Sequence, residues 1–297
     1  MYEELQDIAD YPNWLEITPI ELGRSGENKY HIIRNNGIQF ILRTSSSKNY
    51  KRHCESAKFA GFIHETLGLN MNIPVEVAAC NSDKLAYTIY TWVEGVDADR
   101  KILNAHTPEQ VKFGEKAGRL LKKIHGVTAP ADILPWDEFY NPRLDTILDR
   151  FAQTRITFRG SAETVEFLNN NRHLLKDRPQ TALHGDFRSG NLIFDRNGEY
   201  GVIDFDRWCW GDPYMDFQCI RRSCSTAFAR GQINGYFEGS IPRDFFPLMG
   251  FYTAAEIIIS VCEAYPISRT AIDEAVRYAE RTAREYDNFG GLVPTWY

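Results

Sequence analysis

The chain has 297 residues, of which 43% are hydrophobic and 25% are charged, and its formal net charge is −6. This composition is typical of globular proteins with one large or two modest domains, and it excludes a wholly disordered chain, a collagen and a coiled coil. Because the net charge is negative, there is no general electrostatic attraction to nucleic acid or anionic lipid, and we expect neither as a partner.

Signals for export or for a membrane are not evident. The acidic start of the chain, Met1 to Glu4, contains no apolar run, which argues against a secretory signal. No uninterrupted apolar stretch approaches the roughly 18–20 residues that a membrane helix needs. The six cysteines form no C-x-x-C pair, which favours reduced thiols over a disulfide scaffold. We therefore expect a cytoplasmic protein.

The first ninety-odd residues predict short strands around one helix. Two strand-like runs flank Asn36-Gly37, a dipeptide that tolerates the positive φ angles of a tight hairpin turn. Gly68 is a stop signal for the preceding helix. The predicted strands span 18–22, 29–34, 38–43, 74–80 and 85–93, and the predicted helix spans about 48–66.

From about residue 95 the pattern becomes helical. Thr107 and Gln110 form a capping box with Pro108 at the first helical position, and this predicts a helix that runs to His125. A second Asn-Gly turn, at Asn197, predicts a hairpin over 191–206. Further helices are predicted near 143–157, 161–175, 213–229, 244–264 and 269–287.

These elements indicate an α+β fold and not an alternating βαβ fold. We expect a small β-rich N-terminal lobe over 1–94, which includes a hinge near 91–95, and a larger helical C-terminal lobe over 95–297.

The chemistry is concentrated in one stretch of the second lobe. Asp186 is followed by Asn191 five residues later, and Asp204 ends the predicted hairpin. Because a hairpin brings its ends together, Asn191 and Asp204 are expected to converge. Phosphoryl transfer needs one carboxylate that positions and deprotonates the attacking hydroxyl, together with an amide oxygen and a carboxylate that hold Mg²⁺.

The same residues carry a resemblance. The H-G-D-x-x-x-x-N segment from His184 to Asn191, followed by Ile203-Asp204-Phe205, resembles the aminoglycoside phosphotransferase family. This family is a branch of the protein-kinase-like fold that also includes choline, thiamine, homoserine and methylthioribose kinases. The resemblance implies a bilobal kinase-like fold, ATP or GTP as the phosphate donor, and Mg²⁺ as two ions.

The resemblance also implies roles for residues of the first lobe and of the catalytic loop. Arg43 stands where the family normally has a lysine on the donor phosphates, and Glu55 stands where the family has its ion-pair partner. Arg188, two residues after Asp186, is expected to neutralise the transferring phosphoryl group or to form a salt bridge. The remaining nucleotide-binding residues are expected at the tip of a phosphate-covering loop and at the hinge: Ser25, Gly26, Tyr90, Thr91 and Val93.

The acceptor is expected between the 213–264 helices and the Asp186 loop. Glu256 and Glu263, seven residues apart, share one face of a helix, and Tyr252 lies one turn earlier. These acids are either solvated or face a cationic ligand. Together with the resemblance, they imply a cationic, polyhydroxylated small molecule as acceptor, in the first place an aminoglycoside-like antibiotic in a resistance role. A metabolic small-molecule kinase and an inert kinase-like binding module are the alternatives, and the chain is expected to be a monomer or a homodimer.

Overall fold

The computed structural model describes residues 2–21, 27–80, 84–222 and 224–297. Its contacts divide the chain into two compact units. Unit 1 combines Met1–Asp97 with Leu192–Asp206, and unit 2 combines Ala98–Asn191 with Arg207–Tyr297. This division differs from the predicted lobes in residues 95–97 and 192–206. Their strands form one small sheet, and Val202 of this sheet pairs with Met71 and donates to the carbonyl of Asn70 in unit 1.

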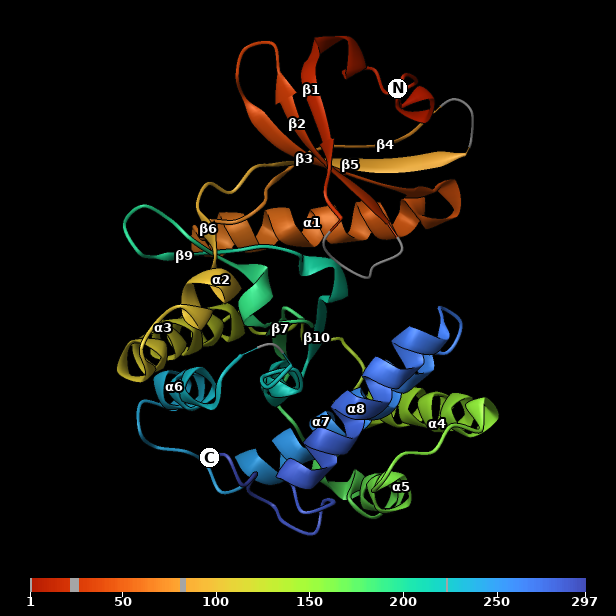
Figure 1. Ribbon diagram of the computed structural model, residues 1–297, viewed down its shortest axis with the longest axis vertical. Coiled ribbons are helices and arrows are strands. Elements are labelled where there is room, and N and C mark those ends of the chain that lie inside the picture. Colours follow the sequence, from red (N-terminus) through yellow and green to blue (C-terminus); the bar gives the residue numbers. More distant parts are fainter. Residues whose placement is uncertain (1, 22–26, 81–83, 223) are drawn as a thin grey trace. The chain divides into compact units, whose positions relative to one another are not determined.

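Unit 1 is built on a five-stranded sheet with the order β1-β2-β3-β5-β4, in which every pair of neighbours is antiparallel. One long helix, α1, packs against β4 and β5 (Figure 1). It ends at Gly68, which has a left-handed backbone with φ 60°, as the stop signal predicts. The elements are β1 (Trp14–Pro19), β2 (Asn28–Arg34), β3 (Gln39–Ser46), α1 (Tyr50–Leu67), β4 (Pro74–Ala79) and β5 (Leu85–Thr91), with 3-10 turns at Glu3–Leu5, Tyr11–Asn13 and Ser47–Asn49.

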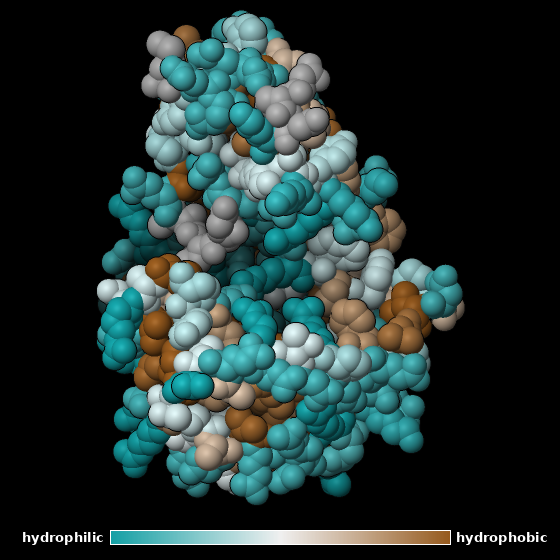
Figure 2. All heavy atoms as spheres, turned by 90° about the vertical axis from the view of Figure 1, so that its right-hand side faces the viewer, coloured by the Kyte–Doolittle hydropathy of each residue, from teal (hydrophilic) through white to brown (hydrophobic). Residues whose placement is uncertain are grey.

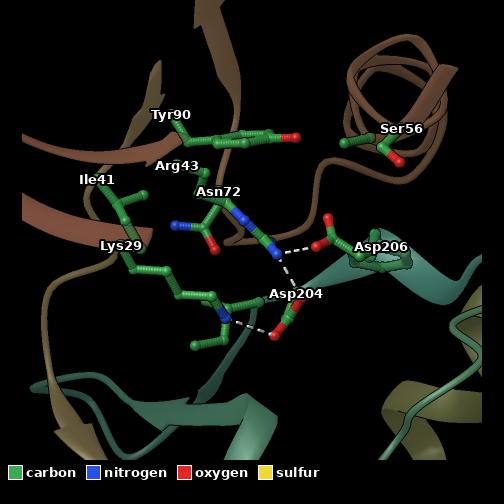
Figure 3. Close-up of a pocket in the computed structure, with 11 residues that line it drawn as sticks. Lys29, Ile41, Arg43, Ser56, Asn72, Tyr90, Asp204 and Asp206 are labelled. Atoms are coloured by element: carbon green, nitrogen blue, oxygen red, sulfur yellow. Dashed lines mark hydrogen bonds and ion pairs between the residues drawn. The ribbon is translucent and has the colours of Figure 1, made fainter. Parts of the chain in front are cut away.

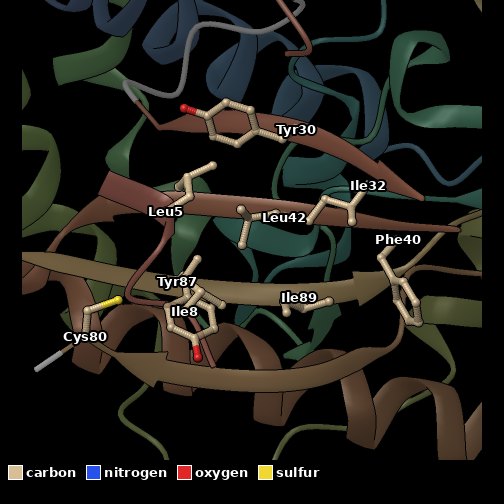
Figure 4. Close-up of a cluster of buried hydrophobic side chains, with 9 residues drawn as sticks. All are labelled: Leu5, Ile8, Tyr30, Ile32, Phe40, Leu42, Cys80, Tyr87 and Ile89. Carbon is tan, nitrogen blue, oxygen red and sulfur yellow. The ribbon is translucent and has the colours of Figure 1, made fainter. Parts of the chain in front are cut away.

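Side chains alternate between the two faces of this sheet. One face is apolar and is covered by Leu5 and Ile8 from the N-terminal segment (Figure 4). The strand residues of this cluster are Tyr30, Ile32, Phe40, Leu42, Tyr87 and Ile89. The residues between them, which include Lys29, Ile41, Arg43 and Tyr90, therefore belong to the opposite face, where the polar site lies.

The second predicted hairpin is confirmed. β8 (Leu192–Phe194) and β9 (Tyr200–Val202) are antiparallel partners, and Gly198 in the turn has φ 76°. β6 (Val96–Asp97) pairs with the other edge of β8. Asn191 immediately precedes β8 and Asp204 follows β9 by two residues, at the end where Leu192 pairs with Val202.

Unit 2 is mainly helical, which confirms the α+β class. A two-stranded antiparallel sheet, β7 (Thr181–Leu183) with β10 (Cys209–Gly211), lies among its helices. The helices are α2 (Ala98–Leu103), α3 (Thr107–His125), α4 (Trp136–Thr154), α5 (Ser161–Asn170), α6 (Thr226–Phe237), α7 (Phe245–Ala264) and α8 (Arg269–Glu285), with 3-10 turns at Arg172–Leu175, Ser189–Asn191, Phe205–Arg207 and Pro213–Phe217.

The helices α3 and α6 cross at close backbone contact. Gly114 and Gly118 on α3 approach the backbone of α6, and Gly231 and Gly235 on α6 approach the backbone of α3. A Cβ added to Gly118 would lie 2.1 Å from the backbone oxygen of Gln232. Only residues without side chains allow this approach, so the four glycines fix the distance between the two helices.

The helix α7 is the core of unit 2. By length and composition it could cross a membrane, but 83% of its apolar window is buried inside the protein, as in a core helix. The face shown in Figure 2 is mostly hydrophilic, and its apolar residues lie in small separate groups. The burial of α7 explains why this apolar helix can exist in a protein with such a surface.

One predicted helix is wrong. The segment predicted as a single helix over 213–229 forms a short 3-10 turn, Pro213–Phe217, and α6 begins only at Thr226. Asp212 caps the 3-10 turn through the N–H of Tyr214, and Ser225 caps α6 through the N–H of Phe228. Two separate caps make two separate elements.

Candidate active site

The polar face of the unit 1 sheet carries two positively charged side chains that lie side by side on neighbouring strands. Lys29 on β2 and Arg43 on β3 are direct cross-strand partners, so their side chains share one face. Both donate to Asp204: Nζ of Lys29 lies 3.2 Å from Oδ2, and Nη1 of Arg43 lies 3.0 Å from Oδ1 (Figure 3). Asp204 has a left-handed backbone with φ 72°, which a non-glycine residue rarely adopts, and it separates the two positive charges.

Arg43 makes more ion pairs than the family position implies. Its guanidinium also contacts the carboxylate of Asp206, and its Nε lies 2.9 Å from Oε2 of Glu27. The Arg43 side chain is almost fully buried, and the attraction of Asp204 and Glu27 outweighs the effect of burial and raises its pKa. Arg43 is therefore a permanently charged side chain that pairs with three carboxylates.

The predicted ion pair between Glu55 and Arg43 is wrong. Glu55 lies on the exposed face of α1, 3.8 Å from Lys51 one turn earlier, and its side chain is 56% exposed. Glu27, just before β2, takes the role of carboxylate partner instead. The partner of Arg43 thus comes from the residue directly before β2 and not from the helix.

Lys29 and Arg43 line a pocket within unit 1. Its apolar lining includes Ile41, Ala60, Ile203 and Phe205, and Tyr90 forms another part of the wall (Figure 3). Tyr90 is only 7% exposed, and burial raises its pKa to about 12, so the ring is neutral at physiological pH. Apolar walls with a few charged groups at one side are typical of small-molecule sites.

The hinge residues differ in whether their backbone N–H and C=O groups already have hydrogen-bond partners. Both backbone groups of Thr91 already have partners within the protein. Its N–H donates to the carbonyl of Ile73, and its carbonyl accepts from Nδ2 of Asn72 at 2.9 Å. The expectation that Thr91 holds a purine is therefore corrected. The described part of the chain provides no hydrogen-bond partner for the backbone of Val93, so Val93 stays a prediction. Ser25 and Gly26 lie outside the described residues.

A second cluster, within unit 2, surrounds Asp186. Its Oδ2 accepts from Nε of Arg188 at 3.3 Å and from Nδ2 of Asn191 at 3.2 Å. The same Asn191 amide nitrogen donates to the backbone carbonyl of Asp186 at 2.8 Å, so both printed bonds of this side chain use its nitrogen and not its oxygen, the atom type that a metal ion needs. The other carboxylate oxygen, Oδ1 of Asp186, is buried and has no hydrogen-bond partner among the described residues.

The loop that carries Asp186 is clamped by Asp216. This fully buried carboxylate accepts from the backbone N–H groups of His184 and Gly185 at 2.8 and 2.7 Å, and from Nε2 of His125 at 3.0 Å. Gly185 has φ 80°, and a Cβ there would lie 1.9 Å from the carbonyl oxygen of Arg207. Asp216 and His184, whose Nδ1 accepts from the Asp186 N–H at 3.2 Å, thus both hold the backbone of this loop.

The predicted acceptor residues are corrected. Tyr252 is fully buried and its hydroxyl donates to Asp212 at 2.9 Å. Glu256 is 2% exposed and accepts from Nη1 of Arg222 at 2.8 Å. Glu263 is half-exposed and pairs with Arg207 at 3.2 Å. The cations that these acids face belong to the protein itself, because an apolar helix can bury a carboxylate only when a charge compensates it.

The two residues expected to hold Mg²⁺ lie one in each unit, Asn191 in unit 2 and Asp204 in unit 1. No group of three or more His, Cys, Asp or Glu side chains in the described ranges is arranged to hold a metal ion alone. Asn191 and Asp204 supply hard oxygen atoms, and Mg²⁺ usually takes only one or two protein ligands with phosphates and water. The three carboxylates around Lys29 and Arg43 leave a net charge of −1, which also favours a cation.

Comparisons with known proteins agree with the phosphotransferase resemblance. The sequence model of the phosphotransferase enzyme family (APH) matches residues 16–251. No curated protein sequence matches the chain. Many solved structures do: one is the ADP-bound aminoglycoside phosphotransferase APH(2'')-Ib, with 18% identity, a TM-score of 0.62, and coverage of 95% of this chain and 97% of the other.

Two further neighbours have higher TM-scores. A thermostable APH(4)-Ia mutant in a ternary complex with ADP and hygromycin B has 17% identity and a TM-score of 0.69, with coverage of 98% of this chain and 100% of the other. A GDP complex of a mutant aminoglycoside 2'-phosphotransferase-IIIa has 13% identity and a TM-score of 0.72, with 96% of both chains covered. At these identities the structures establish the kinase-like fold, and the family match covers most of the chain. The chain belongs to the APH family of phosphotransferase enzymes, which makes it a kinase-type enzyme with a hydroxyl acceptor.

Proposed function

We propose that this enzyme moves the γ-phosphate of a nucleoside triphosphate to a hydroxyl group of a small molecule, with Asp186 as the group that accepts the hydroxyl proton. The observation that carries the proposal is the asymmetry of the Asp186 carboxylate. Arg188 and Asn191 hold Oδ2, whereas Oδ1 is buried without a partner among the described residues. A buried acceptor atom without a donor is costly, and a substrate hydroxyl would satisfy it.

The donor is proposed to be ATP or GTP. Solved neighbours contain ADP or GDP, and the unit 1 pocket combines apolar walls with Lys29 and Arg43. Within this proposal Tyr90 limits the depth of the base site and Val93 offers backbone groups to the purine.

Asn191 and Asp204 are proposed to hold Mg²⁺, as two ions together with the nucleotide. Bound Mg²⁺ would neutralise charge on the phosphate oxygens, which is the main chemical requirement of phosphoryl transfer. Arg188 holds Asp186 in the structure, and it is the nearest cation on the catalytic loop for charge on the transferring group.

The proposed acceptor is a hydroxylated antibiotic, in line with the hygromycin B bound to one structural neighbour. A metabolic acceptor of lower positive charge is the second candidate. The observation that favours it is the pairing of Glu256 and Glu263 with Arg222 and Arg207, which leaves these acids compensated within the protein. The intact set of Asp186, Asn191 and Asp204 argues against an inert binding module. We expect a cytoplasmic monomer or homodimer.

A turnover assay with Mg-ATP and Mg-GTP tests both the proposed reaction and the proposed acceptor. The acceptor panel holds aminoglycosides, tuberactinomycins and macrolides on one side, and choline, thiamine and sugars on the other. Antibiotic phosphorylation, with protection of cells that express the gene, supports the first candidate. Turnover of a metabolite without protection moves the assignment to the second. Absence of nucleotide binding and of turnover with every acceptor contradicts the proposed reaction.

A further inference from the structure

Lys29 has the properties of a ligand-binding cation. It lines the unit 1 pocket, and its side chain is 11% exposed. Within the described part of the chain its ammonium has one acceptor, Oδ2 of Asp204 at 3.2 Å. An ammonium group has three N–H donors, so two remain for another anion.

Arg43, at the position where the family has its phosphate lysine, is differently placed. All three of its guanidinium nitrogens donate to carboxylates, those of Glu27, Asp204 and Asp206. Two of its five N–H groups remain, but a movement of the guanidinium toward a phosphate would break its contacts with carboxylates that are largely buried with it, which is strongly destabilising. Its planar fork matches the task of holding several acids in fixed positions.

The placement of the two cations favours a division of roles. As cross-strand partners, Lys29 and Arg43 are like charges held on one face of the sheet, and Asp204 lies between them with one oxygen for each. In the proposed reaction Asp204 also holds a metal ion. Lys29 then loses part of its single partner's charge, whereas Arg43 keeps Glu27 and Asp206.

We propose that Lys29 of β2 is the lysine that contacts the donor phosphates, and that Arg43 is a positioning residue that holds Asp204 and Asp206. This inference rests on the proposed nucleotide donor. It relocates the phosphate-binding amine from β3 to the neighbouring strand, on the same face of the sheet.

The test is equilibrium binding by calorimetry, without turnover, of the full chain and its variants. Each purine nucleoside is compared with its diphosphate, with and without Mg²⁺. Lys29→Met is expected to weaken diphosphate binding by about tenfold to a hundredfold, the range of one charge-assisted hydrogen bond. Nucleoside binding is expected to stay within about twofold, because the base site is unchanged. Lys29→Arg keeps the charge and is expected to recover part of the diphosphate affinity.

Two controls separate contact from structure. Lys51→Met removes an exposed lysine of the same unit, whose side chain is 89% exposed, and is expected to bind both ligands like the unmodified protein. Arg43→Lys keeps one charge but not the fork, and it is expected to lower the melting temperature, whereas Lys29→Met leaves Asp204 paired with Arg43 and is expected to preserve it.

The outcomes are distinct. If Lys29→Met binds the diphosphate as tightly as the unmodified protein, or loses nucleoside and diphosphate affinity equally, the inference is wrong while the nucleotide donor stands. If the unmodified protein binds no purine nucleotide with or without Mg²⁺, the proposed function fails and the inference fails with it.

Discussion

The carboxylate of Glu256 accepts a hydrogen bond from Nη1 of Arg222 at 2.8 Å, in the interior of unit 2. Glu256 is fully buried, and burial raises its pKa above the ordinary value of 4.5 even though Arg222 and Arg207 oppose the shift. The pair therefore belongs to the interior of unit 2 and not to a surface that binds cations.

Removal of Arg222 is expected to destabilise the protein. Arg222→Leu leaves a buried carboxylate without its cation, a change that typically costs about 3–5 kcal/mol. The cost should shrink at acid pH, because Glu256 can then be protonated. Urea unfolding of the variant and the unmodified protein between pH 5 and 8 measures this, and an equal cost at every pH would contradict the assignment.

Glu256→Gln tests whether the pKa of Glu256 is raised on folding. A carboxyl group whose pKa is raised on folding binds more protons in the folded state. Its stabilising contribution is complete below the unfolded pKa and is lost as pH rises through the folded pKa. The unmodified protein should lose this contribution as pH rises above 4.5, whereas the amide variant lacks the dependence. Parallel stability curves for the two proteins would show that Glu256 does not titrate in this way.

Asp186 is expected to act on the rate and not on donor binding. Asp186→Asn removes the proton acceptor and should reduce kcat by about 10²–10⁴-fold, the usual contribution of a general base. The dissociation constant of the nucleotide should change little. Single-turnover kinetics with the true acceptor, together with calorimetry, make the comparison, and near-normal turnover would reject Asp186 as the base.

Asp204 and Asn191 should differ in their effect on metal dependence. Asp204→Ala removes a charge as well as an oxygen, so it should abolish the tightening of nucleotide binding by Mg²⁺ more completely than Asn191→Ala. The ratio of nucleotide affinities with Mg²⁺ and with chelator reports this for each variant. Full Mg²⁺ dependence in the Asp204 variant would exclude it as a ligand.

Tyr90 is expected to influence the choice of purine. Because its ring is buried in the pocket wall, Tyr90→Ala should deepen the site and change the ratio of kcat/KM for ATP and GTP by about tenfold or more. Tyr90→Phe keeps the ring and should keep the ratio. A strong ATP preference that is the same in all three proteins would dismiss the role of this residue in base selection.

The crossing of α3 and α6 predicts an asymmetry between two glycine substitutions. Gly118→Ala places a Cβ 2.1 Å from a backbone oxygen and should cost at least about 1–3 kcal/mol through overpacking. Gly61→Ala, in α1, meets its nearest neighbour at 3.9 Å and should stabilise by up to about 1 kcal/mol through helix propensity. Thermal unfolding of both variants is the measurement, and equal effects would contradict the close crossing.

Local signals in the sequence predicted the fold class and both hairpins, because an Asn-Gly turn depends on two adjacent residues. The helix predicted over 213–229 failed because Asp216 is used by a distant loop, at His184 and Gly185, and not by its own segment. Long-range pairing also explains the error at Glu55. The resemblance placed the partner on α1, whereas Glu27, the residue directly before β2, pairs with Arg43.

Lys29 was missed although the sequence contained a usable signal. The Asn36-Gly37 turn fixes the register of β2 against β3, and this register places Lys29 opposite Arg43. Its approach to Asp204 could not be inferred in the same way, because Asp204 is 175 residues away along the chain.

The place of Lys29 also bears on chemical targeting. Among the described residues that line the unit 1 pocket, Lys29 is the one primary amine, and it belongs to β2. An acylating or sulfonylating probe built on a purine and designed for kinases with a lysine on β3 would direct its reactive group at Arg43, which such reagents do not modify. We expect a probe with its reactive group shifted by one strand to label Lys29 of this enzyme.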